Sequence, residues 1–346
     1  MPTTLDEYRL LGNSGLRVSP MCLGTMTFGE EWGWGASEDE SRRMLDSYAD
    51  KGGNFLDTAD MYTNGTSERF LGKFLQGRRD RFVVATKYSF NSRPGDANAF
   101  GNHRKHLREQ LEGSLSRLQT DYIDLYWVHV YDGITPVEET MRALDDAVRA
   151  GTILYIGVSD FPAWKVSQAN TLAELRGWTP FIALQIEYSL LERTVERDLV
   201  PMALDFNLGI TPWSPLAGGV LSGKYLANKN EPKRFPAEDE MSRRYFKPEK
   251  VRTVEEVVKI SKEVGRSPAQ VALAWLMQKP GVTSPIIGGR KASHLDDNIA
   301  ALSLDLPADA MKRLDAVSAV DMGFYNEFVN NPPVKQNLYG GTKVAR

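Results

Sequence analysis

Four polar residues follow three successive apolar runs of the sequence. Asp57 and Tyr62 follow the run NFL, Lys87 closes the run VVATK, and His129 follows the run DLYWV. Because the carboxyl ends of parallel strands meet at one face, we expect these four side chains to lie close together. An ammonium group favours tyrosinate, so Lys87, paired with Asp57, is expected to lower the pKa of Tyr62. Tyr62 would then donate a proton to a developing alkoxide, and His129 would hydrogen-bond the same oxygen.

Each of these residues alone has a plainer interpretation. A lone Tyr or Lys at a strand end is usually structural or exposed, a buried Asp–Lys pair is often architectural, and a single His commonly completes a core. Their joint order and spacing favour a reaction site. A metal-dependent hydrolase is a poorer interpretation, because the four histidines are too scattered to form a ligand set. They stand at positions 103, 106, 129 and 294.

Short apolar runs alternate with amphipathic segments along the chain. The predicted strands are 20–24, 54–57, 82–86, 123–128, 153–158, 182–186, 209–213 and 284–287. Helix starts with capping pairs are predicted at Ser37 with Glu40, Thr135 with Glu138, and Ser267 with Gln270. This alternation requires parallel connections, which leaves an open doubly wound sheet or a closed barrel.

Eight runs favour the barrel. The first run also ends in GTMTFG, without the G-x-G-x-x-G spacing of a doubly wound dinucleotide-binding fold. We therefore predict an α/β protein with a single (β/α)8 TIM barrel domain over residues 1–346. An Asn-Ser-Gly turn within 8–18 predicts an N-terminal β-hairpin that plugs one end of the barrel. Residues 216–250 and the tail after about 318 lack a clear period, and the first of these predicts a lid or binding loop.

The composition argues against several classes of protein. The 346 residues carry a formal net charge of -3 with dispersed Lys and Arg, so a nucleic-acid partner is not expected. No apolar stretch approaches the roughly 18 residues of a membrane span, and the start MPTTLDEYRL lacks the features of a signal peptide. A cytoplasmic protein without a membrane partner is therefore expected. Cys22, the one cysteine, is predicted to be a buried strand residue.

The chain resembles the aldo-keto reductases from residue 8 to about residue 304. The resemblance rests on strings in family order: GTMTFG, NFLDTADMY, ATKY, YIDLYWVH, GVSDF, LQIEYSLLER, WSPLAGGVLSGKY and IIGGRKASHLDDN. It implies reversible NADPH-dependent reduction of a small-molecule aldehyde or ketone to an alcohol, and it is compatible with a homo-oligomer. It further implies that Tyr62 is the general acid and that Asp57 and Lys87 tune it. His129 is implied to position the carbonyl.

The same resemblance implies where NADPH binds. Ser159, Asp160 and Gln185 would hold the nicotinamide carboxamide, and Trp213 would stack on the ring. The ribose and pyrophosphate would contact Gly24, Thr25, Met26, Asp57, Ser214, Pro215, Leu216, Gly218 and Lys224, with 216–224 closing over them. The adenosine end would lie at 287–298, near Gly288, Arg290, His294, Asp297 and Asn298.

Three of these positions carry more specific expectations. Arg290 has the donor fork suited to a 2′-phosphate, which favours NADPH over NADH. Asp160 stands where many relatives have Asn, and a carboxylate cannot donate to the carboxamide oxygen unless it is protonated. Asp297 replaces a more common Glu, which is one methylene longer.

Aromatic residues are expected to line the substrate pocket. They are Trp32, Trp34, Tyr88, Phe90, Tyr131 and Phe161. Such a lining suits an apolar or aromatic carbonyl compound. A different class, an NADPH-binding redox-sensing regulatory subunit, is the alternative, since potassium-channel β subunits are similar in WSPLAGGVLSGKY. The sequence lacks the long N-terminal extension expected of that class.

Overall fold

The computed structural model describes residues 3–227 and 240–342. Eight parallel strands form one sheet in the order β10-β3-β4-β5-β6-β7-β8-β9. Their bounds are β3 (Cys22–Gly24), β4 (Phe55–Asp57), β5 (Val83–Tyr88), β6 (Ile123–Val128), β7 (Ile153–Ser159), β8 (Phe181–Glu187), β9 (Gly209–Trp213) and β10 (Ile286–Ile287). Each predicted run overlaps one of these strands.

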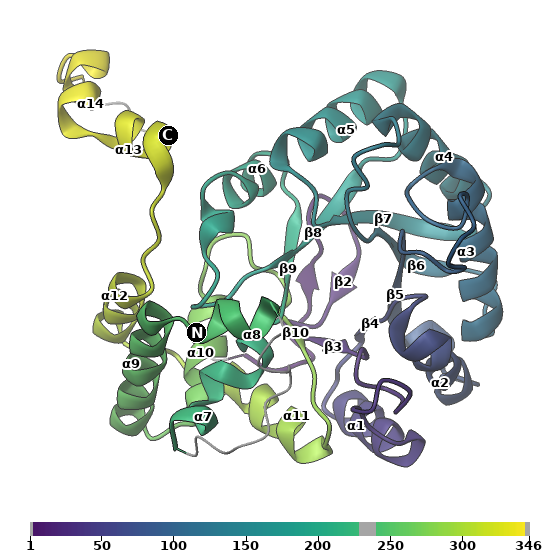
Figure 1. Ribbon diagram of the computed structural model, residues 1–346, viewed down its shortest axis with the longest axis horizontal. Helices are drawn as coiled ribbons and strands as arrows, with labels where there is room; N and C mark the ends of the chain where they lie inside the picture. Colours follow the sequence, from purple (N-terminus) through teal and green to yellow (C-terminus); the bar gives the residue numbers. More distant parts are fainter. Residues whose placement is uncertain (1–2, 228–239, 343–346) are drawn as a thin grey trace.

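The two edges of this sheet approach each other. The backbone N–H of Thr283, which leads into β10, donates to the carbonyl oxygen of Ile210 in β9 at 2.8 Å. A parallel bridge also joins Ile210 to Val282. The sheet therefore nearly closes on itself, with helices around it, and the predicted (β/α)8 TIM barrel is confirmed (Figure 1).

Helices follow most strands and form the outer layer of the barrel. They are α1 (Glu38–Asp50), α2 (Thr66–Phe74), α3 (Arg104–Leu118), α4 (Val137–Arg149), α5 (Ala163–Arg176), α6 (Leu199–Asp205), α7 (Lys224–Ala227), α8 (Glu240–Tyr245), α9 (Pro248–Val264), α10 (Pro268–Met277), α11 (Ala292–Ile299) and α12 (Ala308–Val317). Within the predicted loop 216–250, the 3-10 helix η4 (Ala217–Ser222), α7 and α8 were not foreseen, and residues 228–239 lie outside the described residues.

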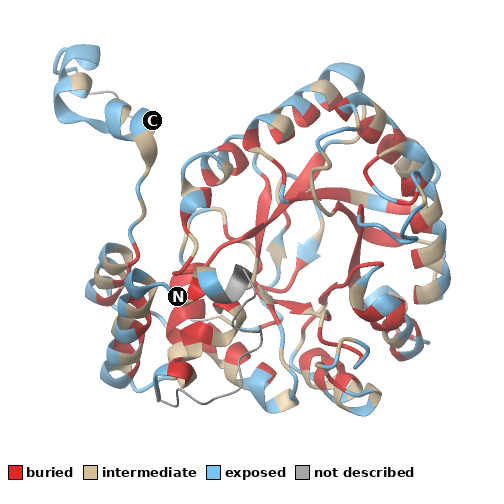
Figure 2. Cartoon of the chain, in the orientation of Figure 1, coloured by how far each residue is buried: buried red, intermediate tan, exposed pale blue. Residues whose placement is uncertain are grey.

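A packed apolar core fills the barrel toward the amino-terminal ends of its strands, and Figure 2 shows most of the barrel strands in the buried colour. Phe55, Leu125 and Trp127 belong to it, and Cys22 is buried there as predicted. The antiparallel hairpin of β1 (Arg9–Leu10) and β2 (Arg17–Val18) closes this end, because Val18 joins the same cluster. The filled end leaves the opposite, carboxyl end for a site.

Helix capping agrees with the sequence at two of three places. Ser37 and Ser267 act as N-caps that accept from backbone N–H groups. Thr135 does not cap α4, so that prediction was wrong: Pro136 occupies the N-cap without a side-chain acceptor. Asp132 instead accepts from the N–H of Thr135 at 3.0 Å, because a short Asp side chain reaches backbone groups just after it.

The tail after residue 318 contains two helices, α13 (Gly323–Asn330) and α14 (Pro332–Tyr339), which the sequence pattern did not indicate. Figure 1 shows them projecting away from the barrel. Their apolar side chains remain exposed, with Phe324 at 80% and Leu338 at 70%. These helices therefore bury none of their residues on the barrel.

Gly157 makes room for the largest side chain of the barrel core. A Cβ added at Gly157 would lie 2.3 Å from Cε3 of Trp127, which is fully buried. We expect Gly157→Ala to lower the free energy of unfolding by about 1–3 kcal/mol, because a close-packed core resists added volume. Gly15→Ala is the matched control, since nothing lies within 4 Å of its added Cβ. Equal urea midpoints for the two variants would contradict this packing argument.

Candidate active site

Three strands bring the four predicted residues together at the carboxyl end of the barrel. Asp57 is the last residue of β4, Lys87 lies near the end of β5, and His129 directly follows β6. Tyr62 begins the 3-10 helix η1 (Tyr62–Gly65) after β4. Alternate residues of a strand point to the same side of a sheet, and these strand-end residues point inward.

Lys87 is the centre of this cluster. Its Nζ is fully buried and donates to Oδ2 of Asp57, to the carbonyl oxygen of Thr58 at 2.7 Å and to the hydroxyl of Tyr62 at 3.2 Å. The other oxygen of Asp57 accepts from Nε2 of Gln185 at 2.9 Å. Because all of its partners are fixed, Lys87 holds the Tyr62 hydroxyl at a defined point in the barrel mouth.

The electrostatics of Tyr62 differ from the expectation. Burial raises the pKa of the Tyr62 phenol, and Lys87 lowers it while Asp57 raises it, so that the net direction is upward. The loss of hydration of the phenolate raises the pKa of Tyr62 by more than the adjacent ammonium lowers it. Burial alone would lower the pKa of Lys87, yet Asp57 and Tyr62 together raise it. Tyr62 is therefore a neutral phenol beside an ammonium at neutral pH, which suits a proton donor.

His129 lies across from Tyr62. Their ring centroids are 6.0 Å apart, and the rings of Phe90 and His129 form a T-shaped pair with centroids 4.8 Å apart. The backbone N–H of His129 donates to the carbonyl oxygen of Tyr88 at 2.9 Å, which fixes the residue to β5. Burial, followed by the charge of Lys87, lowers the pKa of His129 well below its usual range. The imidazole is therefore neutral at pH 7, and one of its ring nitrogens carries a proton that it can donate.

The loop that carries Tyr62 is held by its neighbours. Thr63 has a φ of 46°, which is rare for a β-branched residue, and its Oγ1 donates to the carbonyl oxygen of Phe28 at 2.6 Å. Thr66 also donates to the carboxylate of Glu31. Both contacts join the loop after β4 to the loop after β3, so the tyrosine is positioned by two segments.

A cavity of about 640 Å³ opens at this end of the barrel. All of the residues predicted to bind the cofactor line it: Gly24, Thr25, Met26, Asp57, Ser159, Asp160, Gln185, Trp213, Ser214, Pro215, Leu216, Gly218, Lys224, Gly288, Arg290, His294, Asp297 and Asn298. Tyr62 and His129 line it as well, whereas Lys87 lies behind Tyr62. Four further lining residues were not predicted: Thr27, Met61, Ala269 and Ile286. Four others lie within the predicted segments 216–224 and 287–298 but were not named individually: Gly219, Ser222, Ile287 and Gly289. Most of these residues are next to a predicted residue in the sequence, and that adjacency was the signal by which they could have been found.

Three of the six predicted substrate residues line the cavity, namely Trp32, Trp34 and Phe90. The Trp32 ring lies 5.6 Å from Trp34 and 6.4 Å from Tyr62, centroid to centroid. The loop after β3 thus supplies an aromatic wall beside the tyrosine. Met61 extends this wall with a flexible apolar side chain.

Tyr88 lies elsewhere. It follows the inward-pointing Lys87, so its side chain points outward, where its ring stacks on Tyr126 at 5.2 Å and is fully buried. Tyr131 and Phe161 are also absent from the cavity lining and instead pack against each other at 5.1 Å. The prediction that these three residues line the substrate pocket was wrong. Tyr88 points outward because side chains alternate along β5, and Tyr131 and Phe161 contact each other instead of the cavity.

One end of the cavity concentrates positive charge. Arg290, Lys224 and His294 line it, and Lys291 is adjacent. Burial and then the charges of Arg290, Lys291 and Lys224 lower the pKa of His294. Within residues 3–227 and 240–342, no carboxylate forms an ion pair with Arg290. These donors fit a ligand with several phosphate groups.

Asp297 lies at the same end but is engaged by the protein. Its carboxylate oxygens accept from Oγ of Ser267 at 3.0 Å and from Nε2 of Gln270 at 2.7 Å. The nearby Asn298 donates to the carbonyl oxygen of Gly288 at 3.4 Å. Asp297 therefore holds the start of α10 as well as lining the cavity.

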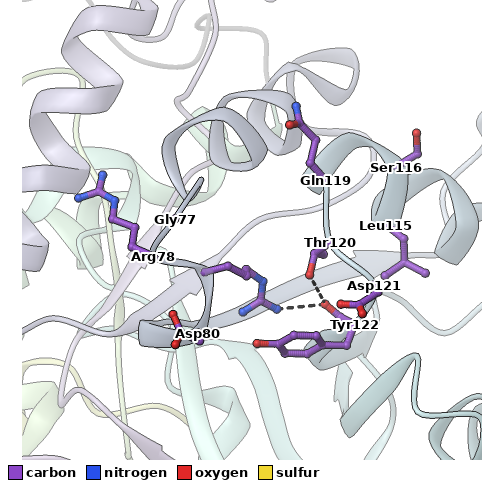
Figure 3. A pocket seen from close by; sticks show the side chains of 10 residues that line it. Gly77, Arg78, Asp80, Leu115, Ser116, Gln119, Thr120, Asp121 and Tyr122 are labelled. Carbon is purple, nitrogen blue, oxygen red and sulfur yellow. Dashed lines mark hydrogen bonds between the residues drawn. The ribbon is translucent and has the colours of Figure 1, made fainter.

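A second hollow lies at the opposite end of the barrel, where β5 and β6 begin (Figure 3). Its principal cation is already engaged: Arg79 donates to the carbonyl oxygen of Tyr122 at 3.0 Å and lies 2.7 Å from Asp124. The guanidinium of Arg79 also covers the ring of Tyr122 at 4.3 Å. These contacts pack the barrel and supply no reactive group.

In the described parts of the chain, no helix is long and apolar enough to cross a membrane.

The structure shows a barrel with an ionisable cluster and a positively charged end of the cavity, and comparison with known proteins assigns its class. The model of the Aldo/keto reductase family matches residues 20–319, and the chain belongs to this family. The protein is therefore an oxidoreductase of a family that uses a nicotinamide cofactor and small-molecule substrates.

Named relatives match nearly the whole chain. The "Norsolorinic acid reductase" of Aspergillus flavus is 39% identical, with 96% of this chain and 87% of that protein covered. The "Aryl-alcohol dehydrogenase [NADP(+)]" of Phanerodontia chrysosporium is 38% identical, with 93% and 89% covered. The "Uncharacterized oxidoreductase YrpG" of Bacillus subtilis is 40% identical, with 90% and 95% covered.

Proposed function

We propose that this protein is an NADPH-dependent reductase that interconverts aromatic aldehydes or ketones and the corresponding alcohols. The observation that carries the proposal is the Asp57–Lys87–Tyr62 chain at the mouth of a cavity that also holds His129. When bound, the nicotinamide supplies or accepts the hydride. The remaining chemistry belongs to the side chains of this protein.

Tyr62 is the general acid in the reduction direction. Its neutral phenol donates a proton to the carbonyl oxygen as negative charge develops there. Lys87, 3.2 Å from the Tyr62 hydroxyl, stabilises the tyrosinate that remains. His129, kept neutral by burial, donates to the same carbonyl oxygen and orients it. In alcohol oxidation the same groups act in reverse.

The cofactor assignment rests on charge and shape. Arg290, Lys224 and His294 at one end of the cavity fit a pyrophosphate and a 2′-phosphate. At the other end, Ser159 and Gln185 supply hydrogen-bonding groups for a carboxamide, and the indole of Trp213 supplies a flat surface for a nicotinamide ring. The printed name of one relative includes NADP(+), which supports the same choice.

The substrate class is inferred from the wall beside Tyr62. Trp32, Trp34 and Phe90 present aromatic surface there, which favours an aromatic ring next to the reacting carbonyl. The name of the aryl-alcohol dehydrogenase agrees with an aromatic substrate.

The test is a panel of aromatic and aliphatic aldehydes, ketones and alcohols, with cofactor absorbance followed in both directions. We expect steady NADPH oxidation with aromatic aldehydes and slower oxidation with aliphatic ones. Tight NADPH binding without turnover of any compound would instead favour the redox-sensing regulatory subunit.

Arg290 is the second point at which the proposal is testable. We expect Arg290→Ala to weaken NADPH binding by about 10- to 100-fold, because it removes charge-assisted hydrogen bonds to the 2′-phosphate. Binding of NADH, which lacks that phosphate, should change by less than about twofold. Calorimetric titration with both cofactors measures this, and Arg252→Ala, an exposed arginine of α9, is the control. An equal effect on both cofactors would remove Arg290 from the 2′-phosphate site.

A further inference from the structure

Asp160 has an unusual backbone conformation at the mouth of the cavity. It directly follows β7, and its φ of 48° lies in the left-handed region that few residues other than Gly, Asn and Asp adopt. Its backbone N–H donates to the carbonyl oxygen of Gln185 at 3.2 Å, and its carbonyl oxygen accepts from the N–H of Tyr131 at 3.3 Å. Neighbouring segments on both sides therefore hold Asp160 in place.

Asp160 lines the cavity and keeps part of its surface open to solvent, although the surrounding protein partly desolvates its carboxylate. Its Oδ1 accepts from Nε1 of Trp213 at 3.1 Å. This bond orients the indole beside the carboxylate of Asp160. Among the described residues, no Lys or Arg forms an ion pair with Asp160.

The other ionisable groups near Asp160 are either paired with an opposite charge or neutral. The positive charge of Lys87 is balanced by Asp57, with which it forms a buried ion pair. His129 is neutral, because burial and Lys87 keep its pKa well below the usual range. These three residues together contribute no net charge, so Asp160 adds a negative charge that they do not cancel.

Glu187, at the end of β8, is the remaining carboxylate that acts on Asp160. It forms an ion pair with Arg244 and accepts from the hydroxyl of Tyr245, both in α8. Its charge is therefore balanced by its own partner. The wall of the cavity around Trp213 carries one uncompensated charge, and that charge is the carboxylate of Asp160.

We propose that Asp160 makes this site bind the oxidised nicotinamide, whose ring is cationic, more tightly than the neutral reduced form. This inference rests on the proposed function, because it takes the nicotinamide to lie beside Trp213. An uncompensated anion beside a ring favours the state in which that ring is positive. By linkage, the bound cofactor is biased toward its oxidised form, which favours carbonyl reduction over alcohol oxidation in the bound complex and slows release of oxidised cofactor after the reduction.

The preference should depend on pH with a definite sign. Burial, aided by the charge of Glu187, raises the pKa of Asp160 to about 6, above its ordinary range, although the Trp213 hydrogen bond and the charge of Lys87 act to lower it. Asp160 is therefore charged above about pH 6 and neutral below it. We expect the preference for NADP+ to be present at pH 8 and to decrease as the pH falls to about 5. His294 and the 2′-phosphate affect both forms of the cofactor alike, so their contributions cancel in the ratio of dissociation constants.

The experiment is calorimetric titration of the purified protein with NADP+ and with NADPH, for the natural sequence and for Asp160→Asn. This substitution keeps an oxygen that accepts from Trp213 and removes the charge. We expect it to weaken NADP+ binding by about tenfold, the equivalent of one pKa unit of interaction, and to change NADPH binding by less than about twofold. Asp121→Asn, in the hollow at the opposite barrel end, is the control with the same change in net charge.

Each outcome distinguishes one interpretation from another. Equal weakening of both forms would mean that Asp160 only orients Trp213, and an unchanged ratio would mean that its charge does not act on the ring; either result overturns the inference while the proposed function stands. If the natural protein binds neither form, the proposed function itself fails. A ratio in the natural protein that is constant from about pH 8 to about pH 5 also overturns the inference, without any need for a variant.

Discussion

Tyr62→Phe is expected to lower kcat for carbonyl reduction by about 10²- to 10⁴-fold, which is the usual contribution of a general acid. The substitution removes only the hydroxyl that Lys87 holds at 3.2 Å, and the ring can keep its edge contacts with Trp32 and His129. NADPH binding should therefore be retained. Steady-state turnover of an aromatic aldehyde and calorimetric titration with NADPH measure the two effects separately.

Tyr88→Phe is the matched control for this prediction. Tyr88 is one residue beyond Lys87, but its ring points out of the barrel and stacks on Tyr126. Its hydroxyl makes one long hydrogen bond, of 3.4 Å, to the carbonyl oxygen of Asn102. We expect its turnover to stay near that of the natural protein. Turnover of Tyr62→Phe within tenfold of the natural rate would assign the proton donor to another group.

Lys87→Met is expected to have the largest combined effect on stability and activity. It leaves Asp57, which is buried, without its ionic partner, and breaking a buried pair in this way costs about 3–5 kcal/mol of folding free energy. It also removes the ammonium that stabilises a tyrosinate at Tyr62. Urea denaturation measures the first effect, and turnover of the folded fraction measures the second.

A double variant separates the two effects. Asp57→Asn combined with Lys87→Met removes both charges, so most of the lost stability should return while turnover remains low. If turnover returns together with stability, Lys87 acts only as a structural residue. If neither variant changes the urea midpoint, the buried ion pair contributes nothing measurable to folding.

The sequence alone was sufficient to predict the barrel, because strand and helix periods are local properties of the chain. Short apolar runs separated by amphipathic segments indicated all eight strands, and polar residues at the ends of three runs indicated where the reacting groups meet. Asp57, Lys87 and His129 could be placed on one face, since parallel strands present their carboxyl ends together. Cys22 was likewise recognisable as a core residue from its apolar neighbours.

Tertiary structure decided the properties that depend on several segments at once. The pKa of Tyr62 is raised, because burial is a property of the assembled site and outweighs the Lys87 charge that the sequence reveals. The outward direction of Tyr88 follows from its exact position within β5. The compensation of Glu187 by Arg244, which leaves Asp160 as the uncompensated charge, joins residues that are far apart in the chain. The sequence therefore determines the residue types and the strand and helix periods. The hydration of the site residues and the balance of their charges depend on the packing of segments that are distant in the chain.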